Sequence, residues 1–179
     1  LVSRPRLRAL LDEGSHHKLT LVSAPAGFGK TTLLSEWIDG SGVRESTAWF
    51  SVDKRDNDPF QFWTYIVAAI QTVSGDFGID ILETLKSPQP PPIDFILYDL
   101  INEISMITSS IFLVIDDYHL ITDQKVNDGL HILIENLPPS FHIILLSRVD
   151  PAWSLAQYRA YGEVAEIRAA NLRFTLDEV

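Results

Sequence analysis

The sequence of 179 residues predicts a three-layer α/β fold with a mostly parallel central sheet, and two observations carry that prediction. Segments that are apolar throughout, such as "IFLVI" at 111–115 and "FHIILLS" at 141–147, alternate with segments of helical periodicity. Strands that are apolar on both faces belong in a sheet covered by helices on both sides. In addition, the glycine-rich segment "APAGFGKTT" at 24–32 stands between a predicted strand and a predicted helix, which is typical of phosphate-binding loops.

The first half of the chain contains two strand–helix pairs. The segment 18–23 is apolar and β-branched, and after the glycine loop a helix is predicted that ends at 39–40. A second strand is predicted at 47–53. The helix that follows it, 58–73, begins with a capping aspartate and a proline at its first position. The order strand, loop, helix is the context that a phosphate-binding loop requires.

The second half of the chain continues the same alternation. Its predicted elements in chain order are a stiff proline-rich connector at 87–92, a helix over 93–108, a strand at 111–115, a helix over 125–135, a strand at 141–147 and a strand at 164–167. Strands that alternate with helices in this way form parallel sheets, because each helix carries the chain back to the same edge.

Composition excludes several classes of protein. The formal net charge is −10 and the basic residues are scattered, which argues against binding to a nucleic-acid backbone by this chain itself. The absence of cysteine excludes a disulfide framework and a thiolate metal site, so a cytoplasmic location is the default expectation. No apolar run approaches the stretch of about 20 residues that spans a bilayer, so we expect no membrane segment.

We expect three parts along the chain. These are an N-terminal segment 1–17, a nucleotide-binding core 18–150, and a final segment 151–179 that leads toward a further domain. The chain starts at Leu1, and Thr175 with Glu178 forms the start signal of a helix that would continue beyond the last residue. We therefore expect a piece of a longer protein.

The glycine loop follows the pattern G-x-x-x-x-G-K-[ST], except that Ala24 replaces the first glycine. Backbone N–H groups in such a loop surround a phosphate, and an alanine is tolerated at the first position only at negative φ. Lys30 is expected to reach the β and γ phosphates, and the Thr31 hydroxyl to ligate magnesium. The alternative is an ordinary turn with a solvated lysine. The residues predicted to bind the nucleotide here are Ala26, Gly27, Phe28, Gly29, Lys30, Thr31 and Thr32.

Two adjacent carboxylates follow the strand 111–115. Ligands bind at the carboxyl ends of parallel strands, so Asp116 is predicted to hold magnesium and Asp117 to polarise the attacking water. The alternative is that both side chains cap the next helix. Adjacent buried carboxylates repel each other unless a cation lies between them, which favours the magnesium site.

Other polar residues give weaker signals. Arg148 follows the strand 141–147 and is predicted either to contact the γ phosphate as a catalytic group or to pair with an aspartate. Asp53 is placed in a solvated loop. The histidines show no metal-ligand spacing and are taken as surface or core residues; they are His16, His17, His119, His131 and His142.

Six motifs occur in order along the chain: "RPRLRALLDEG", "LTLVSAPAGFGKTTLLSEW", "AWFSVDKRDNDPFQFWTYIVAAI", "LVIDDYHLI", "ILLSR" and "NLRFTLDE". Together they resemble the NTPase domain of the large ATP-binding LuxR-type transcriptional regulators, the MalT-like branch of the STAND class. The resemblance covers nearly the whole chain. It implies a P-loop NTPase fold of the ASCE/AAA+-like type, and within it Ala24 is an ordinary variant of the loop.

The resemblance also implies a function. It implies a regulatory switch that binds ATP or ADP with Mg²⁺, in which ATP favours self-association and slow hydrolysis resets the switch, with DNA bound only by a C-terminal domain outside this sequence. It implies that Val2 and Arg4 contact the adenine, and that the strand ending at Ser147 lies between the loop strand and the Asp116 strand. The alternatives are a P-loop phosphotransferase or a scaffold without hydrolysis.

Overall fold

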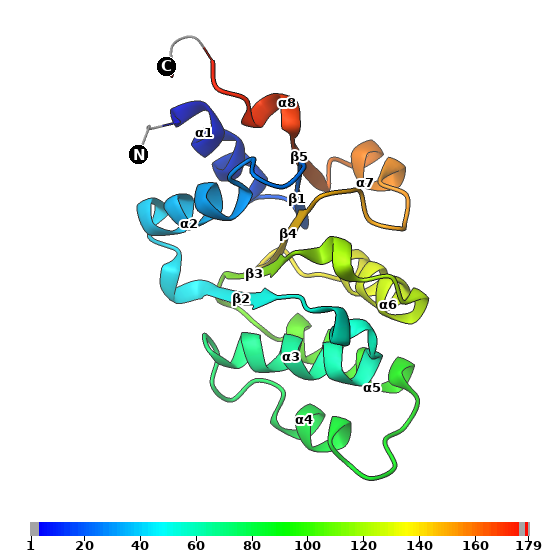
Figure 1. Ribbon diagram of the computed structural model, residues 1–179. Coiled ribbons are helices and arrows are strands. Elements are labelled where there is room, and N and C mark those ends of the chain that lie inside the picture. The colour runs from blue at the N-terminus through cyan, green and yellow to red at the C-terminus, as the bar shows by residue number, and fades with distance from the viewer. Residues whose placement is uncertain (1–3, 176–177, 179) are drawn as a thin grey trace.

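The computed structural model describes residues 4–175 and 178. Within that part of the chain, five parallel strands form one sheet in the order β2-β3-β4-β1-β5 (Figure 1). The strands are β1 (Leu19–Ser23), β2 (Thr47–Ser51), β3 (Ile111–Asp116), β4 (Phe141–Ser147) and β5 (Val164–Arg168). The predicted parallel sheet is confirmed, and β4 lies between β1 and β3, as the family resemblance implied.

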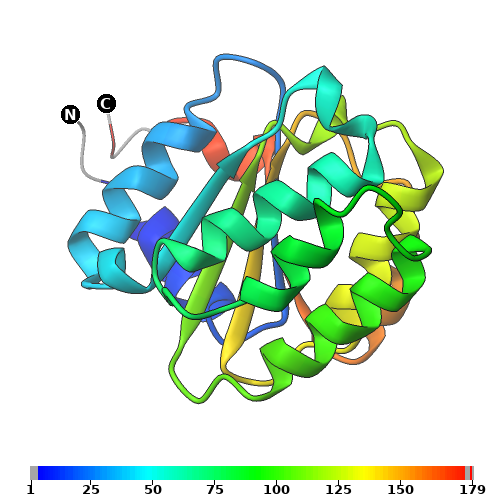
Figure 2. The same cartoon turned by 90° about the horizontal axis from the view of Figure 1, so that it is seen from below.

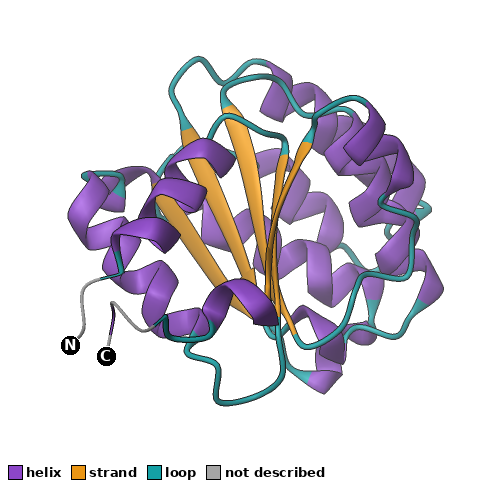
Figure 3. Ribbon diagram, turned by 90° about the horizontal axis from the view of Figure 1, so that it is seen from above, coloured by secondary structure: helices purple, strands orange, loops and turns teal. Residues whose placement is uncertain are grey.

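Helices cover both faces of the sheet, which gives three layers (Figures 2 and 3). The helices are α1 (Pro5–Gly14), α2 (Lys30–Ser41), α3 (Pro59–Gln71), α4 (Ile79–Leu85), α5 (Ile93–Ser105), α6 (Gln124–Glu135), α7 (Ala156–Ala160) and α8 (Ala169–Leu172). Helices α1, α2 and α8 pack on one face, and α3 to α7 contribute to the core on the other.

The two cores arise from the pleat of the strands. Alternate residues of β3 enter different cores, with Leu113 on the α3 side and Val114 on the α2 side, and every residue of the strand is buried. Because both faces of the strand are apolar, its sequence shows no alternation of polar and apolar residues that would indicate two faces. Among the described residues, no helix combines the length and the apolarity needed to cross a membrane.

Some element boundaries differ from the sequence prediction. Helix α2 passes through 39–40 and ends at Ser41, because Gly42 adopts the left-handed conformation (φ 74°) that ends the helix. Strand β2 ends at Ser51 and not at 53, and the exposed Asp53 caps a 3-10 turn, Lys54–Asn57. In that turn Asp53 and the buried Asp56 each accept a hydrogen bond from the other end of the turn.

Candidate nucleotide-binding site

The glycine loop connects β1 to α2 at the carboxyl edge of the sheet. Gly27 and Gly29 have positive φ, 82° and 72°, a conformation that side chains with a Cβ rarely adopt. Ala24 is buried, and its φ is not positive. An alanine can therefore occupy this position without backbone strain. The loop conformation therefore requires glycine where the sequence has it and tolerates alanine where the first glycine is replaced.

Lys30, at the first position of α2, folds back across the loop. Its Nζ donates hydrogen bonds to the carbonyl oxygens of Ala24 at 2.7 Å and Pro25 at 3.0 Å. Burial lowers the pKa of the Lys30 ammonium, the Arg148 guanidinium lowers it further, and two nearby carboxylates oppose the shift. The Lys30 ammonium therefore interacts with charged side chains at the ends of β3 and β4. A lysine that binds phosphates at this edge of the sheet would need such a position.

The two residues predicted to hold magnesium meet each other. The Thr31 hydroxyl donates to Asp116 Oδ2 at 3.0 Å, and the backbone N–H of Asp117 donates to Asp116 Oδ1 at 2.8 Å. Asp116 is 7% exposed, and burial raises the pKa of its carboxyl above the ordinary range, although both hydrogen bonds oppose that shift. A hydroxyl and a buried carboxylate are the hard oxygen ligands that Mg²⁺ prefers, so this pair fits the ion.

We expect Asp116→Asn to stabilise the nucleotide-free chain at pH 7. The folded-state pKa of Asp116 is raised, so ionisation costs folding free energy once the pH exceeds that pKa, and the amide removes the cost. The gain should be about 1 kcal/mol, or roughly 2–4 °C in Tm, and should shrink as the pH falls toward about 4. Thermal unfolding at several pH values measures it, with the exposed Asp99→Asn as control. A destabilised variant at pH 7 would contradict this interpretation.

Asp117 has an unusual backbone. With φ 56° it is the one non-glycine residue at positive φ within 4–175 and 178. Its side chain is 51% exposed and makes no capping hydrogen bond to the 3-10 turn that follows, Tyr118–Leu120. Aspartate adopts this conformation more readily than most residues, and here the Asp117 N–H donates to Asp116 Oδ1.

Arg148 lies at the next strand end along the sheet. The Ser147 hydroxyl donates to the carbonyl oxygen of Val149 at 2.6 Å, which turns the chain directly after β4. Arg148 is exposed, and in the part of the chain described here it forms no ion pair with a carboxylate. Its charge lowers the pKa of Lys30 and of His119, so Arg148 lies near both side chains.

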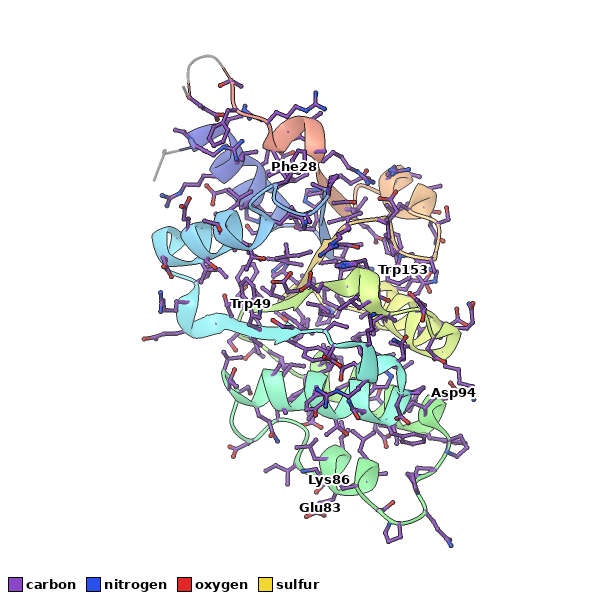
Figure 4. All side chains as sticks on the ribbon, viewed as in Figure 1. Phe28, Trp49, Glu83, Lys86, Asp94 and Trp153 are labelled. Atoms are coloured by element: carbon purple, nitrogen blue, oxygen red, sulfur yellow. The ribbon has the colours of Figure 1, made fainter. Side chains whose placement is uncertain are left out.

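A cavity of about 680 Å³ lies beside the glycine loop, between the start of α2 and the end of α8. In Figure 4 Phe28 lies next to α8, at this cavity. The residues that line it are Arg4, Gly27, Phe28, Gly29, Thr32, Leu33, Glu36, Leu172, Arg173 and Phe174. It is large enough for an adenosine group and adjoins the loop, so a nucleotide could extend from this cavity across the loop to the two aspartates.

Arg4 belongs to this cavity but is held by the end of α8. Its Nη2 donates to the carbonyl oxygen of Leu172 at 2.5 Å, and its guanidinium lies 4.5 Å from the centre of the Phe174 ring. Val2, the other residue predicted to contact adenine, lies outside the described residues. The adenine contacts therefore stay predictions.

The structure brings together most of the residues that the sequence singled out. The loop residues surround one bend, with Ala26 exposed and Thr32 on the cavity wall, and Asp116 meets Thr31. Sequence reasoning missed Phe174 and the other residues near the end of α8, because a long-range contact places them here. His119, taken from the sequence as a surface or core residue, is mostly buried, with its side chain 13% exposed and its Nδ1 atom 3.9 Å from Asp117 Oδ1.

Comparison with known proteins gives two kinds of relative. No family model matches the chain. The chain is 34% identical over 177 residues to the HTH-type transcriptional regulator MalT of Serratia proteamaculans, covering 99% of this chain and 19% of the relative. MalT of Cronobacter sakazakii gives the same identity and coverage. The chain thus spans about a fifth of the length of the curated relatives it matches.

Solved structures resemble the fold at much lower identity. The Aeropyrum pernix ORC1 protein, solved in complex with DNA, matches with a TM-score of 0.63 at 14% identity, covering 94% of this chain and 45% of that one. Cdc6p from Pyrobaculum aerophilum matches with a TM-score of 0.58 at 16% identity, covering 92% and 44%. These likenesses confirm the three-layer, AAA+-like architecture. The chain is a MalT-like domain with the P-loop NTPase fold.

Proposed function

We propose that the chain is the ATP-binding switch domain of a MalT-type transcriptional regulator, with slow ATP hydrolysis. The observation that carries the proposal is the contact between Thr31 and Asp116, which joins the start of α2 to the end of β3 beside the glycine loop. The similarity to MalT over 99% of the chain supports the regulatory context. Because ATP carries a γ phosphate that ADP lacks, groups at the ends of β3 and β4 can distinguish the two nucleotides.

Each residue of the site has its own role in the binding and hydrolysis of ATP. Thr31 and Asp116 would hold Mg²⁺, which neutralises charge on the phosphates. Lys30 binds the β and γ phosphates, and Arg148 binds the γ phosphate from the other side. In hydrolysis, a water oxygen bonds to the γ phosphorus, the bond to the bridging oxygen breaks with its electron pair leaving on ADP, and Asp117 accepts the water proton.

The wider assembly belongs to the same proposal. ATP binding would favour self-association of the longer protein, and DNA would be bound by a separate domain, since this chain has a net charge of −10. The segments 1–17 and 151–179 would complete the adenine site and connect to the next domain. In support, Arg4 and Phe174, which belong to these two segments, contact each other at the cavity.

Calorimetric titration of the chain tests the proposal. We expect ATP and ADP to bind with one site each and Mg²⁺ to increase the affinity for ATP, because Thr31 and Asp116 would hold the ion and its charge would offset that of the phosphates. GTP and AMP serve as comparison ligands for the base and the phosphates. No binding of ATP or ADP in the millimolar range, with or without Mg²⁺, would contradict the assignment.

A further inference from the structure

His119 lies next to the proposed water-activating residue and has no assigned role. It stands in the 3-10 turn Tyr118–Leu120 that follows β3, and its side chain is 13% exposed. Its Nδ1 atom is 3.9 Å from Asp117 Oδ1. That nitrogen is buried and has no hydrogen-bond partner among the described residues. A buried polar atom without a partner costs free energy, so a state in which it gains one is favoured.

The partner within reach is Asp117. A hydrogen bond between a nitrogen and a carboxylate oxygen spans about 2.7–2.9 Å, so the present separation is about 1 Å too long. Asp117 is held at positive φ and its side chain is half-exposed, without a capping contact. A rotation of this carboxylate toward the imidazole closes the gap, and catalytic hydrogen bonds are often long before the substrate binds.

The charges around the imidazole determine its form. Burial is the largest cause that lowers the pKa of His119, followed by the Arg148 guanidinium. Lys30 lowers the pKa further, whereas the carboxylates of Asp117 and Asp116 raise it. A neutral imidazole carries one N–H, and the tautomer with that hydrogen on Nδ1 can donate to a carboxylate without removing its ability to accept a proton.

We propose that His119 is a positioning residue for hydrolysis, whose Nδ1–H donates to the Asp117 carboxylate in the nucleotide-bound state and orients it toward the attacking water. This inference rests on the proposed ATPase function. It assigns His119 no contact with the nucleotide. Removal of the imidazole should therefore slow turnover and leave nucleotide affinity unchanged.

Two substitutions separate orientation from packing. His119→Leu removes the donor and should lower the single-turnover rate by about 100-fold, the cost of a 1 Å misplacement of a catalytic group. His119→Asn keeps an N–H close to the position of Nδ1 and should stay within roughly tenfold of the unmodified rate. Both variants should bind ATP and ADP within about twofold of the unmodified chain. The control is His131→Asn. His131 is a half-buried residue of α6 whose ring stacks on that of Trp153, and Trp153 lies in the loop before α7 (Figure 4).

A measurement without turnover makes the test independent of the hydrolysis rate. Imidazole ¹⁵N spectra are recorded with Mg²⁺ and adenosine 5′-(β,γ-imido)triphosphate, for the unmodified chain and for Asp117→Asn. We expect the Nδ1–H tautomer of His119 in the complex, with a shift that Asp117→Asn changes. The Nε2–H tautomer, or a spectrum insensitive to that substitution, overturns the proposal.

The outcomes distinguish this proposal from the function on which it rests. If the unmodified chain binds no nucleotide, the proposed function fails. If it binds nucleotide and His119→Leu weakens ATP but not ADP, then His119 contacts the γ phosphate and the positioning role is wrong. If His119→Leu and His119→Asn slow turnover equally, the imidazole acts by packing, and the positioning role is again wrong.

Discussion

Lys30→Ala should weaken ATP binding by about 10- to 150-fold. The substitution removes a charge-assisted contact to the phosphates that is worth roughly 1.5–3 kcal/mol. The Lys30 ammonium donates to two loop carbonyls, and these contacts would compete with a phosphate for the same hydrogens. Part of the gain is spent on that exchange, so the effect should lie in the lower half of the range. Calorimetric titration with ATP and Mg²⁺ measures it.

The matched control is Lys86→Ala. Lys86 is exposed at the end of α4, on the far side of the molecule from the glycine loop (Figure 4). This variant removes the same charge and should leave ATP affinity unchanged, so it separates a specific contact from the effect of net charge. Equal affinity for Lys30→Ala and the unmodified chain would show that the glycine loop is an ordinary turn. A circular dichroism spectrum of each variant excludes unfolding as the cause of a loss.

The centre of the sheet was predictable because β3 and β4 are largely apolar on both faces and buried throughout. β3 and β4 begin at the predicted residues, and their carboxyl ends bring Asp116 and Ser147 to one edge, as parallel pairing requires. Helix α4 was not predicted. It spans only Ile79–Leu85 and starts at a glycine in the left-handed conformation with no side-chain cap, so neither length nor a start signal indicates it.

The phosphate end of the site was more predictable than the base end. The glycine loop is local, so its bend and its lysine follow from consecutive residues. The cavity wall depends on Arg4 bonding to Leu172, two residues separated by 168 positions, and no periodicity encodes that contact. His119 differs from both, since the burial of its unpaired nitrogen beside Asp117 follows from packing and not from the local sequence.

Asp117→Asn should preserve ATP binding and reduce hydrolysis by at least about 100-fold. Asparagine keeps the size and one acceptor oxygen, but it cannot accept a proton at neutral pH, and general-base catalysis contributes roughly 10²- to 10⁴-fold. The structure indicates that this substitution changes the charge of the side chain and leaves the local fold intact. Asn tolerates positive φ as well as Asp does, so the backbone at φ 56° is not strained further. The half-exposed side chain also makes no capping bond that would be lost.

The experiment pairs ATP affinity with single-turnover hydrolysis for Asp117→Asn and Asp116→Asn, with Asp99→Asn as the exposed control. Asp116→Asn should reduce the Mg²⁺ dependence of binding, because a hard dication prefers an anionic oxygen. We therefore expect Asp116→Asn to change mainly the Mg²⁺ dependence of ATP affinity and Asp117→Asn to change mainly the rate of hydrolysis. The two carboxylates are adjacent but differ in burial. If Asp117→Asn hydrolyses ATP at the unmodified rate, Asp117 does not activate the water. The strain at its backbone would then serve to aim the N–H at Asp116 Oδ1, the bond that it already forms at 2.8 Å.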